Sequence, residues 1–256
     1  MAAVKDIFNN LNDWAPVETK MDFDNVGHLV GFENAEVTRI LTALDITDEV
    51  IDEAAEAGAQ LIVSHHPMFF GLKNVVDSDI KGRKIIKLIQ NNMSAICMHT
   101  NLDAAEGGVN TLLASACGIT EPAKLYDEPN SIGCYGEIGE ETDFFDYLKT
   151  VKHALGTSTL RYVYAGKPVK KVAVLGGSGG DDMMRAIELG CDTYVTADLK
   201  YHKFLDAKEY GLNLIDGDHF CTENLVVPAI KLRINEYFPE IQVIISQRHR
   251  QTVQFF

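Results

Sequence analysis

The amino-acid sequence predicts an α/β fold built from two similar units. Strand-like and helix-like segments alternate between residues 38 and 116, the pattern of a sheet covered by helices. The same alternation resumes between residues 170 and 246. The two stretches can be laid over each other so that Gly58 falls on Gly190, Ser64 on Thr196 and His66 on Asp198. This alignment indicates an internal duplication, with a cleft between the two units as the expected ligand site.

The first half of the chain shows clear helix and strand signals. Apolar residues recur at helical spacing over 4–14 and predict an amphipathic helix. A β-branched, apolar run over 38–45 predicts a buried strand. We expect a helix over 48–57, where Thr47 can cap the first turn and Gly58 can end the last. Further strands are expected at 61–64 and 94–98, and further helices at 78–92 and 109–116.

The second half begins with a segment over 121–168 that does not continue the earlier alternation of strand-like and helix-like stretches. Strands at 134–138 and 160–165 are expected to flank an amphipathic helix that carries Phe144 and Phe145. We then expect strands at 170–177, 192–196, 212–216 and 241–246, and helices at 181–189, 201–208 and 222–237. Pro228 should kink or shorten the last helix. The predicted units are residues 1–125 and 126–256, with the C-terminal part of the second packing back on the first.

Composition excludes several classes of function. The 256 residues carry 23 Lys and Arg against 37 Asp and Glu, for a net charge of −14. Such an acidic chain is not expected to bind long nucleic acids or anionic membranes. No apolar run is long enough to cross a bilayer, so we expect no transmembrane helix, and we expect no signal peptide because the first residues lack a long apolar centre. Five cysteines without a CxxC pair predict a reduced, cytoplasmic protein rather than a disulfide framework.

Histidines and carboxylates gather after predicted strands. His65 and His66 follow the strand at 61–64, and His99 stands four residues before Asp103, just beyond the strand at 94–98. In the second half, His219 and Glu223 have the same spacing and would share one face of a helical turn. A single histidine at a strand end is usually structural. Three such motifs together favour a site for two divalent metal ions, which could be Zn, Mn, Fe, Co or Ni.

Other candidates have weaker signals. The GGSGG segment at 176–180 is either a tight strand-to-helix turn or a phosphate-binding loop. Cys221 could be a metal ligand or a nucleophile, although no second cysteine supports it. Asp198 and His202 either line the cleft or bind one another. The remaining expectations are turns at Asp24–Gly27 and at Gly31, and surface positions for His153 and His249.

Seven motifs together make the sequence recognisable. They are DNVGHLVG (24–31), LTALDIT (41–47), IVSHHPMFF (62–70), HTNLDAAEGGVN (99–110), VLGGSGG (174–180), YVTADLKYH (194–202) and DGDHFCTE (216–223). In this order they closely resemble the Nif-three-like family, also catalogued as GTP cyclohydrolase 1 type 2 homologues. The resemblance runs from about Asp22 to the C-terminus. Two positions depart from the family pattern, His28 in place of Leu and Ala197 in place of Gly, and neither is an expected ligand.

The resemblance implies a fold, a metal site and an assembly. It implies two intertwined α/β units with a dinuclear metal site in the cleft between them. It also implies a ring-shaped homohexamer with the metal sites facing its interior. The family's metal ligands fall on His65, His66, Asp103, His219 and Glu223, the last of which would bridge the two ions.

Three functional hypotheses follow. The first is a metal-dependent hydrolase of the GTP cyclohydrolase type, in which metal-activated water attacks a nucleotide-like or other small polar substrate. His99 and Asp45 would then orient ligands or relay protons, and Lys200, Lys203 and Arg161 could contact phosphates. The alternative is a non-catalytic metal-binding or regulatory scaffold that binds protein partners. A third, less favoured hypothesis is a two-metal phosphatase or nuclease. The acidic charge argues against long nucleic acids as its substrate, but not against a mononucleotide.

Overall fold

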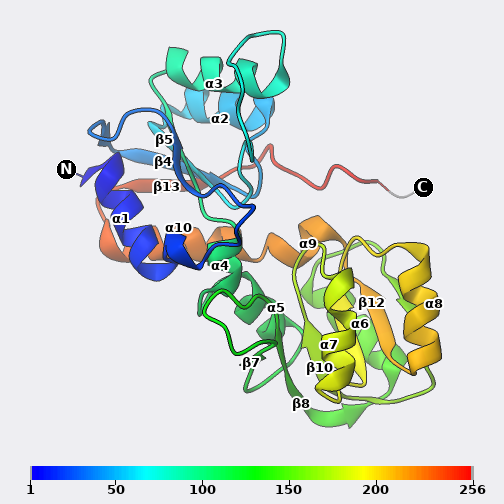
Figure 1. Cartoon of the computed structure of the whole chain (residues 1–256). Helices are drawn as coiled ribbons and strands as arrows, with labels where there is room; N and C mark the ends of the chain where they lie inside the picture. The colour runs from blue at the N-terminus through cyan, green and yellow to red at the C-terminus, as the bar shows by residue number, and fades with distance from the viewer. Residues whose placement is uncertain (1, 255–256) are drawn as a thin grey trace. The chain divides into compact units, whose positions relative to one another are not determined.

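The computed structural model describes residues 2–254, so positions 1, 255 and 256 of the expected units lie outside it. The chain divides into two compact units (Figure 1). Unit 1 contains the described residues up to Ala105 together with Val226–Arg250, and unit 2 contains Glu106–Leu225 and the described residues after Arg250. The expected boundary at residue 125 falls inside unit 2, because helix α5 (Val109–Ala116) packs on two strands of that unit.

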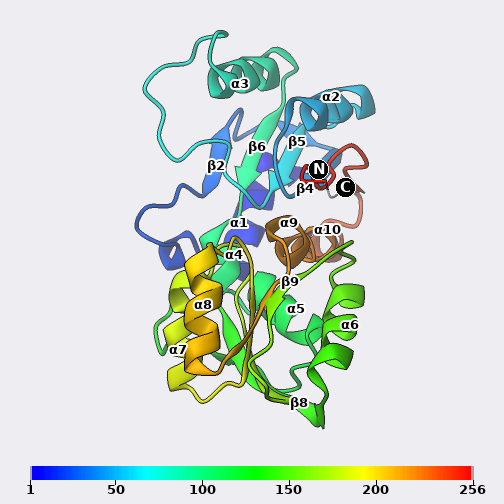
Figure 2. The same ribbon diagram turned by 90° about the vertical axis from the view of Figure 1, so that its right-hand side faces the viewer.

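Unit 1 is built on a five-stranded sheet in the order β13-β4-β5-β6-β2. The first four strands run parallel, and β2 pairs antiparallel with β6. Figures 1 and 2 show α2 and α3 on one side of this sheet and α1 and α10 on the other. The elements of unit 1 are β1 (Ala2–Ala3), α1 (Val4–Trp14), the 3-10 helix η1 (Val17–Thr19), β2 (Gly27–Val30), β3 (Glu36–Val37), β4 (Arg39–Ala43), α2 (Asp48–Ala57), β5 (Leu61–Ser64), α3 (Ile80–Gln90), β6 (Ser94–Cys97), α4 (Thr100–Ala104), α10 (Val226–Tyr237) and β13 (Gln242–Ile245).

Local signals in the sequence explain the ends of helix α2. The Thr47 hydroxyl accepts a hydrogen bond from the Val50 amide at 3.2 Å, which satisfies one of the unpaired donors of the first turn. Gly58 ends the helix in the left-handed conformation, with φ +69°. Both predictions are therefore confirmed. Between these ends α2 buries an apolar face that includes Val50 and Ile51 against the sheet.

Unit 2 is built on a six-stranded sheet in the order β7-β8-β10-β11-β12-β9. The strands β10, β11 and β12 run parallel, while β7, β8 and β9 pair antiparallel at the two sides. The elements of unit 2 are α5 (Val109–Ala116), β7 (Ala123–Lys124), β8 (Cys134–Thr142), α6 (Phe144–Ala154), β9 (Arg161–Val163), β10 (Val169–Val174), the 3-10 helix η2 (Gly180–Asp182), α7 (Met183–Glu188), β11 (Thr193–Thr196), α8 (Tyr201–Tyr210), β12 (Asn213–Asp216) and α9 (His219–Glu223).

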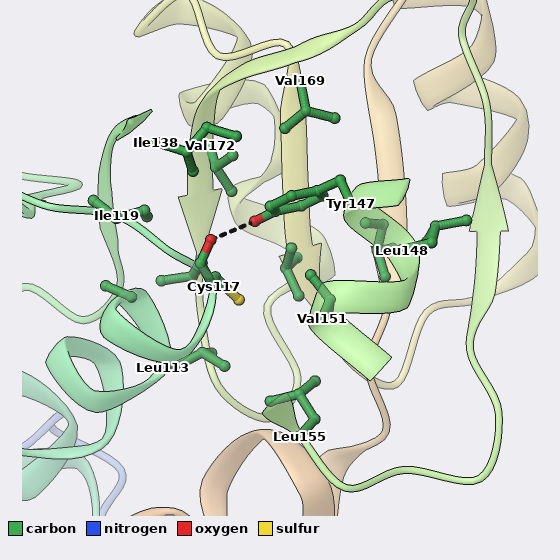
Figure 3. Packing of buried hydrophobic residues seen from close by; sticks show 14 of the residues in the cluster. Leu113, Cys117, Ile119, Ile138, Tyr147, Leu148, Val151, Leu155, Val169 and Val172 are labelled. Carbon is green, nitrogen blue, oxygen red and sulfur yellow. Dashed lines mark hydrogen bonds between the residues drawn. The ribbon is translucent and has the colours of Figure 1, made fainter. Parts of the chain in front are cut away.

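The parallel strands of unit 2 are buried on both faces, as parallel strands usually are. Val172 and Val174 of β10 point to the side of α5 and α6, where they join one apolar cluster. Ala173, between them, belongs to a second cluster with residues of α7 and α8. Figure 3 shows the first cluster, in which the Tyr147 hydroxyl donates a hydrogen bond to the Cys117 carbonyl oxygen at 2.9 Å. This bond ties α6 to the end of α5.

Two sequence predictions are wrong in detail. The expected helix over 222–237 is two helices, because α9 ends at Glu223 and α10 begins at Val226. The last helix is thus shorter than the expected range, which is one of the two effects expected of Pro228. Pro228 lies in the first turn of α10, where backbone N–H groups have no partner within the helix, so its missing N–H costs little. The turn expected at Asp24–Gly27 is not formed, because Gly27 begins the edge strand β2, while Gly31 lies in a bend directly after that strand, as expected.

The remaining expected elements match strands and helices of the structure within a few residues, so the α/β class is confirmed. None of the helices in residues 2–254 has the length and hydropathy that crossing a bilayer requires. All five cysteines lie in the described range and carry free thiols.

Candidate metal-binding sites

Three histidines of unit 1, His65, His66 and His99, lie together at the carboxyl ends of neighbouring strands. His65 and His66 follow β5, and His99 follows β6. These strands pair in parallel with Ser64 opposite Cys97, so the segments that follow them emerge at the same edge of the sheet. One ring nitrogen of each histidine lies within 4.8 Å of those of the other two. We call these three residues the histidine cluster.

Every ring in the histidine cluster is oriented by an oxygen atom at Nδ1. Carbonyl and carboxylate oxygens only accept hydrogen bonds, so the proton lies on Nδ1 and a neutral ring keeps its lone pair at Nε2. Metal-binding imidazoles in proteins are oriented in the same way. The acceptors are the Met98 carbonyl oxygen for His65 at 2.8 Å, Asp45 Oδ1 for His66 at 2.8 Å and Asp24 Oδ1 for His99 at 2.9 Å.

The two carboxylates that orient the cluster stay ionised in acid. Burial alone would raise the pKa of Asp24, but hydrogen bonds led by the one from His99 outweigh it and hold the pKa well below its usual range. Burial would also raise the pKa of Asp45, but hydrogen bonds from His249 and His66 outweigh it and hold the pKa well below its usual range. Both residues therefore carry a negative charge at neutral pH, and a bound cation would be stabilised nearby.

Asp103 is brought to the cluster by a helix that sequence reasoning missed. The short helix α4 begins directly after His99 and carries Asp103 in its first turn. Asp103 Oδ1 lies 3.6 Å from His65 Nε2, and the His65 side chain is fully buried. Two ligands that bind one zinc ion at tetrahedral angles stand about 3.3 Å apart. The spacing of this nitrogen and oxygen therefore fits a shared ion.

Unit 2 holds a histidine–carboxylate pair on helix α9. His219 Nε2 lies 3.0 Å from Glu223 Oε2, one helical turn away, and His219 Nδ1 lies 2.7 Å from Asp198 Oδ2. Burial would lower the pKa of His219, but the bonds to Glu223 and Asp198 outweigh it and raise the pKa to about 9. A proton thus joins His219 to the buried Glu223 at neutral pH when no metal is bound. A metal ion could replace that proton, since both partners are common ligands.

The glycine-rich segment at 176–180 leaves room for Glu223. Gly177 has φ +67°, and a Cβ atom at that position would overlap Glu223 Oε1. Its amide donates to the Thr222 hydroxyl at 3.1 Å, and its carbonyl oxygen accepts from the Ala197 amide at 2.9 Å. The segment therefore forms a tight turn that fits against α9 and β11.

The other candidates from the sequence have different surroundings. Burial and the nearby Asp218 raise the pKa of the Cys221 thiol to about 11, so it is protonated at neutral pH and poorly suited as a nucleophile. Asp198 binds His219 and not His202. The expected surface position of His249 is wrong, because its side chain is only 7% exposed and contacts Asp45.

Sequence reasoning also missed two contributors. Asp24 was expected only as a turn residue, yet it holds the His99 ring. Gly177 was expected only to form part of a turn. It also lies against Glu223, which is 46 positions later in the chain. The DNVGHLVG motif at 24–31 was the signal that could have drawn attention to Asp24.

Comparisons with known proteins agree over nearly the whole chain. The sequence model of a family described as Duf34/NIF3 (NGG1p interacting factor 3) matches residues 2–252. A Clostridium perfringens protein named GTP cyclohydrolase 1 type 2 homolog is 37% identical over 259 residues, which cover 98% of this chain and 99% of that protein. A Clostridium acetobutylicum protein of the same name is 35% identical, with 98% of each chain covered.

Solved structures show the same fold. A Staphylococcus aureus hypothetical protein superposes with a TM-score of 0.91 at 30% identity, covering 99% of both chains. Reduced HcgD from Methanocaldococcus jannaschii superposes with a TM-score of 0.85 at 27% identity, covering 96% of this chain and 98% of that one.

Proposed function

Because the chain belongs to the Duf34/NIF3 family, we propose that it binds two divalent metal ions and hydrolyses a nucleotide-like or other small polar substrate. The observation that carries the metal site is the common orientation of four histidines, each of which has Nδ1 on an oxygen acceptor. The name GTP cyclohydrolase 1 type 2 homolog, borne by the Clostridium relatives, supports a nucleotide as the substrate class.

We assign the metal ligands to both units of the chain. His65, His66 and Asp103 would supply ligands from unit 1, and His219 and Glu223 from unit 2. The pair in unit 2 offers only two ligand atoms, fewer than a stable metal site requires. This shortfall supports a common centre in which Glu223 bridges the two ions. Metal analysis of single-ligand variants tests the assignment, since loss of either set should then reduce both ions.

The side chains around these ligands suit hydrolysis. Divalent ions bound there would lower the pKa of water and stabilise developing negative charge. Asp45 and Asp24 keep the protons of His66 and His99 on Nδ1, so that Nε2 of His99 can accept a proton from water. We therefore assign His99 and Asp45 as orienting or proton-relay residues.

A polar cavity of unit 2 supports a substrate with an anionic group. Its lining includes Ser178, Lys200, His202 and Lys203 together with Asp198, which orients His219. Lys203 is paired with Asp181 at 2.8 Å, Lys200 adds a positive charge, and His202 offers an imidazole that can form hydrogen bonds. A phosphate or carboxylate could bind there despite the net charge of −14.

The decisive experiment is metal-controlled turnover. The protein is stripped of metal, reloaded separately with Zn, Mn, Fe, Co or Ni, and analysed for metal content. GTP and a panel of nucleotides and amides are then screened by mass spectrometry. We expect a product with the mass of added water, or one that has lost a formyl group, only with two ions bound. The double variant His65→Ala/Glu223→Gln should be inactive, while His153→Ala, on the exposed side of α6, should match the wild type.

Two bound metal ions without turnover on any substrate would favour the scaffold function over hydrolysis.

We further propose that the two units arose by duplication, which is supported by three central parallel strands in each sheet. From the resemblance alone we propose a ring-shaped homohexamer in the cytoplasm. Light scattering coupled to size-exclusion chromatography tests the hexamer.

A further inference from the structure

His249 is buried against the site although it lies in a basic segment near the end of the chain. It follows strand β13, and its flanking residues Arg248 and Arg250 are exposed. Its Nε2 atom lies 2.9 Å from Asp45 Oδ2, and its side chain is 7% exposed. The local sequence gives no reason to bury an imidazole here, and the contact with Asp45 supplies one.

The backbone around His249 is held by helix α2. Glu53 of that helix accepts hydrogen bonds from the Ser246 hydroxyl, from the Gln247 amide at 2.8 Å and from the Arg248 amide at 3.2 Å. The His249 amide donates to the Ser246 hydroxyl at 3.0 Å, and Arg248 pairs with Glu56. Several bonds that do not involve Asp45 therefore hold the backbone that carries the imidazole.

Asp45 joins His249 to His66. Its Oδ1 atom accepts from His66 Nδ1 at 2.8 Å. Its Oδ2 atom lies 2.9 Å from His249 Nε2, and the Asp45 amide nitrogen lies 3.2 Å from the same Nε2, so His249 contacts both the carboxylate and the backbone of Asp45. The Asp45 side chain is 42% exposed, so a bond to His66 alone would leave the carboxylate open to rotation and to competition from water. The second bond fixes the plane of the carboxylate, and that plane determines the direction of the His66 ring.

We propose that His249 is a positioning residue, which acts through Asp45 to aim Nε2 of His66 at a metal ion. This inference rests on the proposed metal centre and adds a residue that the seven sequence motifs do not contain. Loss of a partner that orients a metal-binding histidine weakens metal binding by about 10–100-fold. His249 should therefore affect metal affinity without contacting the metal.

The test uses the full-length chain, stripped of metal and titrated with Co²⁺, whose visible absorption spectrum reports the geometry of its ligands. His249→Phe keeps a buried ring but removes the donor. Since His249 acts on the ligand only through Asp45, we expect Co²⁺ affinity to fall by about tenfold, the low end of the range, with an altered spectrum. His249→Gln offers an amide N–H in nearly the same place and should restore most of the affinity and the spectrum. Combining His249→Phe with Asp45→Asn should cause little loss beyond that of Asp45→Asn alone, because both act through one contact.

Two controls separate this role from general effects. Arg248→Ala breaks the pair with Glu56 but leaves the imidazole, so it should bind Co²⁺ as the wild type does. A folded His249→Phe protein with unchanged affinity and spectrum would overturn the proposal, as would an equal loss in Arg248→Ala. If His65→Ala also leaves Co²⁺ binding unchanged, the metal centre itself is wrong, which is a different failure from that of His249 alone.

Discussion

Gly177 offers a sharp test of the site in unit 2. Its φ of +67° is in the left-handed region, and an added Cβ would overlap Glu223 Oε1 and lie 3.3 Å from His219 Cε1. The overlapped atom is the far end of a flexible side chain. In Gly177→Ala we therefore expect the Glu223 carboxylate to swing away from His219 while the fold persists.

The structure provides a matched control for the cost in stability. Gly190 has φ +75°, and a Cβ there would have no neighbour within 4 Å. An alanine in the left-handed conformation costs about 1–2 kcal/mol, so Gly177→Ala and Gly190→Ala should each lower the free energy of unfolding by about that amount. Only Gly177→Ala moves a proposed ligand, and its affinity for Co²⁺ should fall by at least about tenfold.

Urea unfolding of the metal-free proteins gives the stability, and titration with Co²⁺ near neutral pH gives the affinity. Equal Co²⁺ affinities for Gly177→Ala and Gly190→Ala would refute the assignment of Glu223 as a ligand. A much larger loss of stability in Gly177→Ala than in Gly190→Ala would show that the carboxylate cannot move aside.

Three further predictions concern charge, packing and metal. In the metal-free protein, NMR should show His219 titrating with a pKa of about 9, which falls toward its ordinary value of 6.5 in Glu223→Gln. Since folding raises this pKa, the stabilisation from the pair is full below about pH 6.5 and is lost as pH rises through about 9, so the stability difference between wild type and Glu223→Gln should shrink over that range. Tyr147→Phe leaves the buried Cys117 carbonyl oxygen without its donor and should cost about 1–3 kcal/mol in urea unfolding. Removing metal with a chelator should lower the Tm of the wild type, because the ions bind the folded state, and should not change that of His65→Ala/Glu223→Gln.

Each of these has a simple control or contrary result. Tyr210→Phe changes a tyrosine that is 57% exposed and should alter stability by less than about 0.5 kcal/mol. An unchanged His219 pKa in Glu223→Gln would mean that the two side chains do not interact in solution. A chelator effect of equal size in the double variant would place the stabilising ions elsewhere.

Local patterns were enough to predict most of the fold. The apolar runs that became β4, β5 and β6 are short and bounded by polar residues, and burial on both faces leaves few alternatives to a central parallel strand. Thr47 and Gly58 mark the ends of α2 by chemistry that acts within one turn. The histidines that follow strands were predicted for the same reason, because the end of a strand can be recognised in the sequence.

Contacts between distant segments could not be predicted in this way. His249 and Asp45 are 204 residues apart, and no local pattern connects a basic segment near the end of the chain with a carboxylate beside β4. The same holds for Gly177, where a Cβ atom would overlap the Glu223 carboxylate. The boundary after Ala105 was also not predicted, although the return of the C-terminal part of the chain to the first unit was expected.

That return determines the order in which the chain can fold during synthesis. All but the last few residues of unit 2 form one continuous segment, so it can fold soon after it leaves the ribosome. Unit 1 must wait, because β13 pairs with β4 through partners such as Gln242 and Arg39, and α10 packs on the same strands. Until then the nascent chain exposes one edge of β4, a surface on which other chains can add strands. Ribosome-associated chaperones would therefore be most useful during this interval, when the edge of β4 is exposed.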